Sequence, residues 1–202
     1  MSKVRIAVLC SGGGTNFEAI IKAQEAGKIP DGEIVLAVCD SAKAYAIERA
    51  KNHRVESAVF DKKQYPRAER EAAILACLQV HKIELVVLAG FMTVLSESFV
   101  KAYENRIINI HPALLPSFGG VGMYGLRVHE AALARGVKVT GATVHYVTEE
   151  CDGGPIIAQK AVEVKEDDTP EILQKRVMEQ AEWVIYPEAV QTVCKKLKGE
   201  KI

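Results

Sequence analysis

The sequence predicts an α/β fold in which a mostly parallel central sheet carries helices on both faces and ends in an antiparallel portion. In the first half of the 202-residue chain, short apolar runs alternate with stretches whose apolar residues recur at spacings of three and four. The apolar runs are nearly continuous, as is typical of parallel strands buried on both faces. In the second half, two longer strand-like segments follow each other directly, which is typical of an antiparallel pair at a sheet edge.

The first half is expected to form a βαβαβαβ series. Its predicted strands are Val4–Cys10, Ile34–Cys39, Ser57–Phe60 and Leu85–Ala89, and its predicted helices are Asn16–Ala26, Ala42–Asn52 and Arg67–Val80. A fifth strand follows at Arg106–Ile110. The chain should leave the sheet near His111, because Pro112 lacks a backbone donor and restricts the residue before it to extended conformations.

The second half contains a glycine-rich loop, a short helix and the two longer strands. These segments are expected at Gly119–Gly125, Leu126–Ala134, Val139–Val147 and Ile156–Val164. Thr169 and Pro170 then open a final helix, because threonine caps helix N-termini and proline fits the first helical position. Pro187 is expected to break or kink that helix, since it lacks the backbone N–H that a helix interior requires.

The composition indicates one globular domain spanning residues 1–202. Hydrophobic residues make up 49% of the chain, charged residues make up 26%, and the net charge is zero. This balance argues against a nucleic-acid groove and against a membrane-binding face. The five cysteines are widely spaced without a C-x-x-C pair, which argues against a zinc site and a disulfide framework. No signal peptide or membrane-spanning run is evident, so we expect a cytoplasmic protein.

Asn109 and His111 stand two residues apart at the end of the fifth predicted strand. Residues at this spacing project from the same face of a strand, so an amide donor and a titratable imidazole should lie side by side. Open α/β sheets bind ligands at the ends of their strands. Taken alone, the pair is equally compatible with catalysis and with simple hydrogen bonding to a turn.

A second candidate site is the loop Ser11–Asn16, which joins the first strand to the first helix and contains three consecutive glycines. Glycines allow the backbone to approach a ligand closely, and a helix N-terminus presents free N–H groups to an anion. The glycine spacing differs from that of P-loops and dinucleotide sites, so a phosphate monoester fits better. The alternative is a tight turn in which Thr15 and Glu18 form a capping box.

The acidic turn before the last strand holds Glu149, Glu150 and Asp152. Acids in such a turn are more commonly solvated, and a functional role requires that one of them reach His111. A carboxylate beside an imidazole favours the charged form and would raise the pKa of His111. His145 fits either the core or the wall of a site. The remaining histidines have no metal-ligand spacing between them.

Four motifs occur together in order: Ser11-Gly-Gly-Gly-Thr-Asn16, Leu88-Ala-Gly-Phe-Met92, Asn109-Ile-His-Pro-Ala-Leu-Leu-Pro116 and Asp152-Gly-Gly-Pro155. In this combination the chain resembles the phosphoribosylglycinamide (glycinamide ribonucleotide) formyltransferases, a branch of the folate-dependent formyltransferase superfamily. The resemblance extends from Val4 to about Pro187. It implies a Rossmann-like formyltransferase fold, with residues 1–105 as the phosphate-binding half and residues 106–202 as the catalytic and folate-binding half.

The resemblance also implies transfer of a formyl group from 10-formyltetrahydrofolate to the amine of glycinamide ribonucleotide, in de novo purine biosynthesis and without a metal. The implied catalytic residues are Asn109, His111 and Asp152. Gly14, Thr15 and Asn16 would hold the substrate phosphate, and Glu182 would bind its ribose. The implied folate-binding residues are Arg67 near the glutamate tail, Met92, Thr93, Val94, Leu95, Asn109, Thr148, Glu149, Glu150 and Cys151.

These roles agree with the chemistry of the side chains. Negative charge develops on the formyl oxygen when an amine attacks, and preorganised donors stabilise it. Asn109 can donate a hydrogen bond at any pH, whereas His111 can donate and also deliver a proton. Asp152 would keep His111 protonated and oriented. Three departures from the family pattern are Thr93 in place of a frequent arginine, Trp183 in place of a common histidine, and a long glycine-rich loop at 118–125. This loop fits either a mobile lid or simply a longer connection.

Other formyl-handling enzymes and a binding protein are the alternatives. A methionyl-tRNA formyltransferase should carry a C-terminal RNA-binding domain and a basic surface, and a formyltetrahydrofolate hydrolase should carry an N-terminal regulatory domain, for which a start at Met1 leaves no room. A non-catalytic phosphometabolite-binding protein would need the glycine loop but not the Asn-His-Asp set. The expected partners are small-molecule substrates, with no nucleic acid and no membrane, for a monomer or homodimer.

Overall fold

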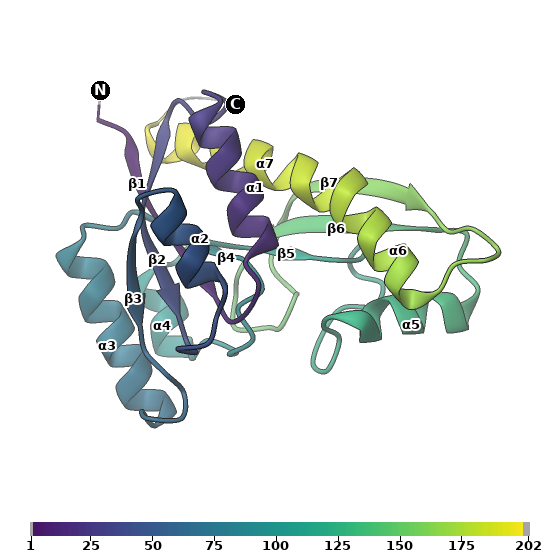
Figure 1. Cartoon of the computed structure of the whole chain (residues 1–202), viewed down its shortest axis with the longest axis horizontal. Helices are drawn as coiled ribbons and strands as arrows, with labels where there is room; N and C mark the ends of the chain where they lie inside the picture. Colours follow the sequence, from purple (N-terminus) through teal and green to yellow (C-terminus); the bar gives the residue numbers. More distant parts are fainter. Residues whose placement is uncertain (1, 200–202) are drawn as a thin grey trace.

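A single seven-stranded sheet forms the centre of the protein (Figure 1), whose computed structural model describes residues 2–199. The strands lie in the order β3-β2-β1-β4-β5-β6-β7. Their bounds are β1 Val4–Cys10, β2 Gly32–Cys39, β3 Glu56–Val59, β4 Leu85–Leu88, β5 Ile107–His111, β6 Val139–Tyr146 and β7 Ile156–Glu163. The first five strands are parallel and the last two pairings are antiparallel, as the sequence predicts.

The helices connect the parallel strands and then close the chain across the antiparallel end (Figure 1). Their bounds are α1 Thr15–Glu25, α2 Ala46–Asn52, α3 Arg67–Val80, α4 Glu97–Ala102, α5 Leu126–Arg135, α6 Pro170–Val177 and α7 Trp183–Leu197, with the π-helical segment η1 Met178–Glu182 between the last two. Within residues 2–199, no helix combines the length and the apolar character that crossing a membrane would require.

Alternating side chains of the strands divide the core into two layers. Ile6 and Val8 of β1 point toward the layer that contains α1, α2 and α7, whereas Ala7 and Leu9 point toward α3 and α4. Both layers are apolar because each parallel strand is buried on both faces. The largest fully buried side chain, Tyr186 of α7, also donates a hydrogen bond to the carbonyl of Leu88 at 2.7 Å. This bond ties α7 to the sheet where β4 ends.

Two features differ from the sequence prediction. Helix α4 was not expected, because its six residues are too few for an apolar periodicity to stand out, although Ser96 caps it by accepting a hydrogen bond from Phe99 N. Of the two outcomes expected at Pro187, a break or a kink, the break is wrong, because α7 continues through this residue to Leu197. Because Pro187 has no N–H, the Trp183 carbonyl has no helical donor four residues later. Trp183 directly follows the π-helical segment, so the π turn and the missing hydrogen bond lie in one irregular stretch.

Candidate active site

A cavity of about 780 Å³ lies at the carboxyl ends of the parallel strands. This is the edge at which open α/β sheets bind ligands. The predicted site residues that line it are Thr15, Asn16, Met92, Thr93, Val94, Leu95, Asn109, His111, Thr148, Glu149, Glu150, Cys151, Asp152 and Glu182. Gly14 and Arg67 lie outside the lining. Both halves of the chain therefore contribute to one cavity.

Strand β5 places Asn109 and His111 on the same face, as their spacing predicts. Their antiparallel neighbours in β6 are His145 opposite Asn109 and Thr143 opposite His111. Directly opposite residues of antiparallel strands project to the same side. The strand pair thus brings four polar side chains together, and β5 ends at His111 immediately before Pro112.

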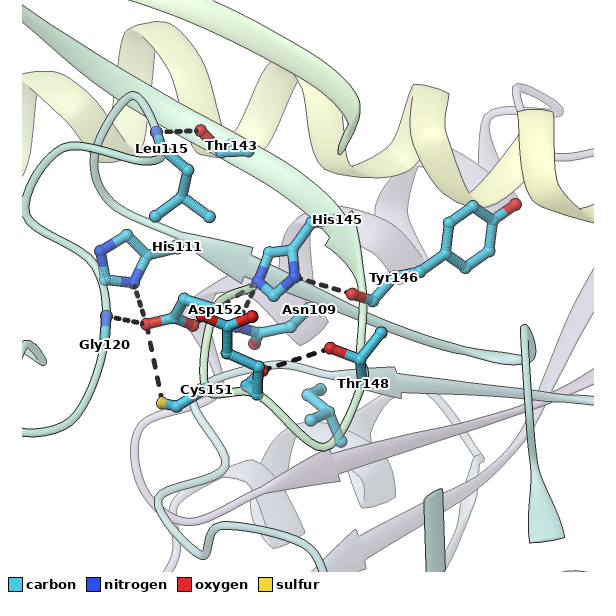
Figure 2. Close-up of polar contacts among 12 residues, drawn as sticks. Asn109, His111, Leu115, Gly120, Thr143, His145, Tyr146, Thr148, Cys151 and Asp152 are labelled. Atoms are coloured by element: carbon cyan, nitrogen blue, oxygen red, sulfur yellow. Dashed lines mark hydrogen bonds and ion pairs between the residues drawn. The ribbon is translucent and has the colours of Figure 1, made fainter. Parts of the chain in front are cut away.

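Asp152 reaches this group from the turn between β6 and β7 (Figure 2). Its Oδ2 lies 3.5 Å from His111 Nδ1 and accepts a hydrogen bond from Gly120 N at 2.9 Å, while its Oδ1 lies 3.6 Å from His145 Nε2. The expected contact between Asp152 and His111 is therefore present. Asp152 adopts a left-handed backbone with φ of 57°, which is uncommon for a residue with a side chain and which concentrates at functional sites.

The net effect on His111 is opposite to the expectation from sequence. Burial lowers the pKa of His111 below its ordinary value, and the neighbouring Asp152, which raises it, does not compensate. The reason is that His111 is only 4% exposed, so a charged ring would lose its hydration. Burial would by itself raise the pKa of Asp152, but the neighbouring His145 ring and the hydrogen bond from Gly120 N lower it below the ordinary range. The pair therefore favours a neutral ring beside a charged carboxylate.

Both ring nitrogens of His111 face an oxygen of the protein. Nε2 lies 2.8 Å from the Phe118 carbonyl, which can only accept, so we assign the proton of the neutral ring to Nε2. Nδ1 then presents a lone pair toward Asp152 Oδ2 at 3.5 Å. Protonation of Nδ1 would turn this arrangement into an ion pair. His111 is thus built to gain stabilisation from Asp152 at the moment it becomes charged.

His145 forms a wall of the site rather than part of a sealed core. Its Nδ1 donates to the Tyr146 carbonyl at 2.9 Å, which leaves Nε2 as the acceptor for the Asn109 amide at 3.2 Å (Figure 2). His145 is 2% exposed, so these contacts fix its orientation. Through them His145 orients Asn109, whose amide carries a second N–H for another acceptor.

The glycine loop presents unbonded amides at the start of α1. Among residues 2–199, the amide N–H groups of Gly13, Gly14, Thr15 and Asn16 donate no hydrogen bond. Gly14 has φ of 70°, and a Cβ there would come within 2.8 Å of Ala46 Cβ, so only glycine fits. The alternative capping box is wrong, because Gly14 is the N-cap and no side chain caps the helix.

Helix α2 holds this loop by donating hydrogen bonds to two carbonyls of the loop. The Gly12 carbonyl accepts from Ala46 N at 3.1 Å, and the Gly13 carbonyl accepts from Arg49 Nε at 2.8 Å. In a trans peptide the N–H points away from the C=O of the same unit. The N–H groups of Gly13 and Gly14 are therefore turned away from the groups of α2 that bind these carbonyls, an arrangement that suits an anion.

Asn16 and Glu182 join the two ends of the chain across the cavity. Asn16 Nδ2 donates to Glu182 Oε2 at 2.6 Å. Burial raises the pKa of Glu182, which is 6% exposed, while the hydrogen bond from Asn16 opposes that rise. Glu182 is the last residue of the π-helical segment, and such segments occur frequently at functional sites.

The segment Met92–Ser96 is held from several sides. Met92 N donates to Ser11 Oγ at 2.8 Å, and the Val94 carbonyl accepts from Arg67 at 2.7 Å. Met92 and Val94 are 48% and 60% exposed, whereas the Thr93 hydroxyl points inward and donates to Asp40 at 2.9 Å. Thr93 therefore lines the cavity while its polar group is directed into the protein.

The cavity also includes residues that sequence reasoning did not select, among them Arg127, His129, Gln174 and Met178. Gln174 and Met178 precede Glu182 by eight and four residues, so their helical spacing could have placed them on its face. His129 carried no comparable signal. Within the described part of the chain, no group of three or more His, Cys, Asp or Glu side chains is arranged to hold a metal ion.

Comparison with known proteins shows the family of the chain. A family model described as formyl transferase matches residues 4–190. The chain belongs to the formyl transferase family. It is similar to the protein named phosphoribosylglycinamide formyltransferase of Bacillus subtilis, with 42% identity over 200 residues that cover 98% of each chain. It is also similar to the trifunctional purine biosynthetic protein adenosine-3 of Gallus gallus, with 46% identity over 196 residues. The matched region covers 96% of this chain and 19% of that protein.

Solved structures of this family share the fold of this formyltransferase. Glycinamide ribonucleotide transformylase 1 from Symbiobacterium toebii superposes with a TM-score of 0.89 at 42% identity, covering 96% of this chain and 89% of that chain. Phosphoribosylglycinamide formyltransferase from Bacillus halodurans has a TM-score of 0.86, also at 42% identity, over 95% of this chain and 96% of that chain. The predicted fold class is confirmed.

Proposed function

We propose that this formyltransferase transfers the formyl group of 10-formyltetrahydrofolate to the amine of glycinamide ribonucleotide, giving N-formylglycinamide ribonucleotide in de novo purine biosynthesis. The observation that carries the proposal is one cavity, in a chain of this family, that joins the cluster of Asn109, His111 and Asp152 to the amide-lined loop of Thr15 and Asn16. A phosphate ester bound at the loop would extend toward the polar cluster.

In the proposed reaction the amine attacks the formyl carbon, and the electrons of the carbonyl bond move to its oxygen. The second N–H of Asn109 and the Nε2–H of His111 donate to this oxyanion, which replaces the Phe118 carbonyl as the acceptor of His111. The C–N bond to the folate then breaks as the carbonyl re-forms. The attacking nitrogen loses a proton and the folate nitrogen gains one, carried by water, while Asp152 stabilises any charge on His111.

The ribonucleotide would bind between the two ends of the chain. Gly14 supplies an amide N–H and the left-handed turn, and Thr15 and Asn16 supply the first amides of α1, so these residues would bind the phosphate. Glu182 would accept hydrogen bonds from the ribose hydroxyls, because its carboxylate lines the cavity next to Asn16.

The reduced folate would lie on the opposite side of the cavity. Met92, Val94 and Leu95 offer apolar surface, and the turn at Thr148, Glu149, Glu150 and Cys151 forms the facing wall, with Thr93 and Asn109 nearby. Arg67 has a 55% exposed side chain and donates to Val94 and Glu71, which leaves further N–H groups of its guanidinium for the glutamate tail.

We further propose that residues 1–202 act as one domain whose halves, 1–105 and 106–202, bind phosphate and folate respectively. The ends of this range, Met1 and residues 200–202, lie outside the described residues. The five cysteines are free, which suits a reducing cytoplasm. Light scattering of the purified protein would distinguish a monomer from a homodimer.

The proposal is tested by supplying 10-formyltetrahydrofolate with glycinamide ribonucleotide and measuring tetrahydrofolate and formylated product in equal amounts. Release of formate without the ribonucleotide would instead indicate a hydrolase, and formylation of methionyl-tRNA would indicate the RNA-directed enzyme. A purely binding protein would show neither product. In that case His111→Ala would leave ribonucleotide affinity unchanged, whereas an enzyme would lose turnover by about 10²-fold or more.

A further inference from the structure

Two buried charged side chains next to the proposed folate segment take no part in the reaction above. Asp40 follows β2 directly and is fully buried, and Arg70 in α3 is 6% exposed. Burying charged groups is costly unless they are paired or hydrogen-bonded. Their presence at this point of the fold therefore calls for a physical explanation.

Both side chains share a single partner. Thr93 Oγ1 donates to Asp40 Oδ2 at 2.9 Å and accepts from an Arg70 terminal nitrogen at 3.4 Å. Among the described residues, neither side chain has another hydrogen-bond partner, and Asp40 Oδ1 and Arg70 Nε have none. A hydroxyl can bind a carboxylate and a guanidinium at the same time, because it donates one hydrogen and accepts through its lone pairs.

The anchors of this bridge are themselves fixed. The Asp40 backbone donates to the Cys10 carbonyl at 3.4 Å, and its carbonyl accepts from Lys62 N at 3.0 Å. Arg70 belongs to α3, whose Glu71 also accepts from Ser96 N at 3.3 Å. The bridge therefore ties the folate segment to the end of β2 on one side and to α3 on the other.

We propose that Asp40, Thr93 and Arg70 are positioning residues for folate binding, forming a buried bridge that turns Met92 and Val94 toward the cavity. The chain bends at Thr93, so holding the Thr93 side chain inward fixes the course of the backbone that carries the side chains of its two neighbours. The exposure of Met92 and Val94 on either side of Thr93 agrees with this arrangement. The inference rests on the proposed function of residues 92–95 as the folate site.

The test compares Thr93→Val, which keeps the shape of the side chain and removes the hydroxyl, with Thr93→Ser, which keeps the hydroxyl. We expect Thr93→Val to raise KM for 10-formyltetrahydrofolate about tenfold and KM for the ribonucleotide by less than about twofold. Thr93→Ser should restore most of the folate affinity. Arg70→Met removes one bond of the bridge and keeps the hydrogen bond between Thr93 and Asp40, so it should raise the folate KM by about threefold. It provides a second measurement where Thr93→Val does not fold.

Thr140→Val is the matched control. Thr140 is 2% exposed and its hydroxyl has no partner among the described residues, so the same chemical change occurs away from the cavity. Thr140→Val should leave the KM values for the folate and for the ribonucleotide unchanged. Equal rises of both KM values in Thr93→Val would overturn the inference. A folate KM that does not rise in Thr93→Val, or that does not rise in Arg70→Met, would overturn it as well.

The proposed function is checked separately by titrating the unmodified protein with 5,8-dideazafolate in a calorimeter. If the unmodified protein neither binds this folate analogue nor turns over the formyl donor, the proposed function fails. If it does both, and Thr93→Val binds the analogue with unchanged affinity, the positioning role alone fails.

Discussion

The protonation of His111 follows from two opposing effects on one side chain. Burial at 4% exposure disfavours the imidazolium, and Asp152 favours it. The contact between these residues agrees with the expectation from sequence, whereas the direction of the pKa shift does not. Sequence spacing identifies neighbours on a strand, but the loss of hydration depends on what covers them, including the loop at Phe118 that folds back onto the ring.

At this scale we predict that Asp152→Asn lowers the pKa of His111 further. The substitution removes the nearby negative charge that raises this pKa and leaves the burial that lowers it. NMR titration of the His111 ring should therefore give a midpoint at lower pH, and turnover should fall by about 10²-fold or more.

Glu150→Gln is the control, because it removes a negative charge from the same turn at an exposed position. The His111 midpoint should stay close to that of the unmodified protein. A midpoint that is identical in Asp152→Asn and in the unmodified protein would show that Asp152 does not influence the charge on His111.

At the scale of elements, α2 shapes the phosphate loop without lining the cavity. Arg49 binds the Gly13 carbonyl, packs over the Tyr45 ring at 5.1 Å and pairs with Glu18 at 3.0 Å. Burial would raise the pKa of Glu18, but hydrogen bonds from Lys22 and Arg49 oppose this effect. The pKa is lowered to about 2. Helix α2 therefore fixes both the loop backbone and the first turn of α1.

We predict that Arg49→Met raises KM for the ribonucleotide by about tenfold and changes kcat less. Without the guanidinium, the Gly13–Gly14 peptide can rotate, and its N–H no longer faces the phosphate. Saturating ribonucleotide should also raise the melting temperature of Arg49→Met less than that of the unmodified protein. Steady-state kinetics and thermal unfolding measure the two effects.

Lys22→Met is the matched control. Lys22 also pairs with Glu18 at 3.0 Å but makes no bond to the loop. Similar losses of ribonucleotide affinity in both variants would mean that general positive charge, rather than the orientation of the peptide, supports binding.

Across the whole molecule, local patterns predict more of the fold than of the site. The pair Asn109 and His111 follows from strand periodicity and the proline after it, and Thr169 caps α6 as expected, accepting from Ile172 N at 3.3 Å. The bond between Asn16 and Glu182 joins residues 166 positions apart, so only the family resemblance pointed to both ends. The buried bridge through Thr93 likewise depends on α3 packing beside β2, which no local pattern specifies.

The stability of the whole chain should depend on His129. Burial lowers its pKa from 6.5 to about 4, and neither ring nitrogen has a hydrogen-bond partner among residues 2–199. An unfolded chain takes up this proton below its ordinary pKa, whereas the folded chain resists until about pH 4. The stabilisation is therefore fully present above pH 6.5 and decreases as the pH falls toward 4.

We predict that His129→Leu loses less stability on acidification than the unmodified protein. The difference at pH 4.5 should be about 2–3 kcal/mol, or roughly 5–10 °C in melting temperature for a chain of this size. Thermal unfolding at pH 7.5 and 4.5 measures it. Parallel decreases in both proteins would assign the acid sensitivity to other groups.

The π-helical segment Met178–Glu182 has a consequence for how this gene can change. A π turn holds one residue more than an α turn, and each residue of an α-helix turns the chain by about 100°. An in-frame deletion of a single codon between α6 and Glu182 would convert the segment to regular helix and rotate one flank against the other. Either Glu182 would turn away from Asn16, or α7 would lose its packing against the sheet. Substitutions can accumulate along this helix, but its length in codons is fixed.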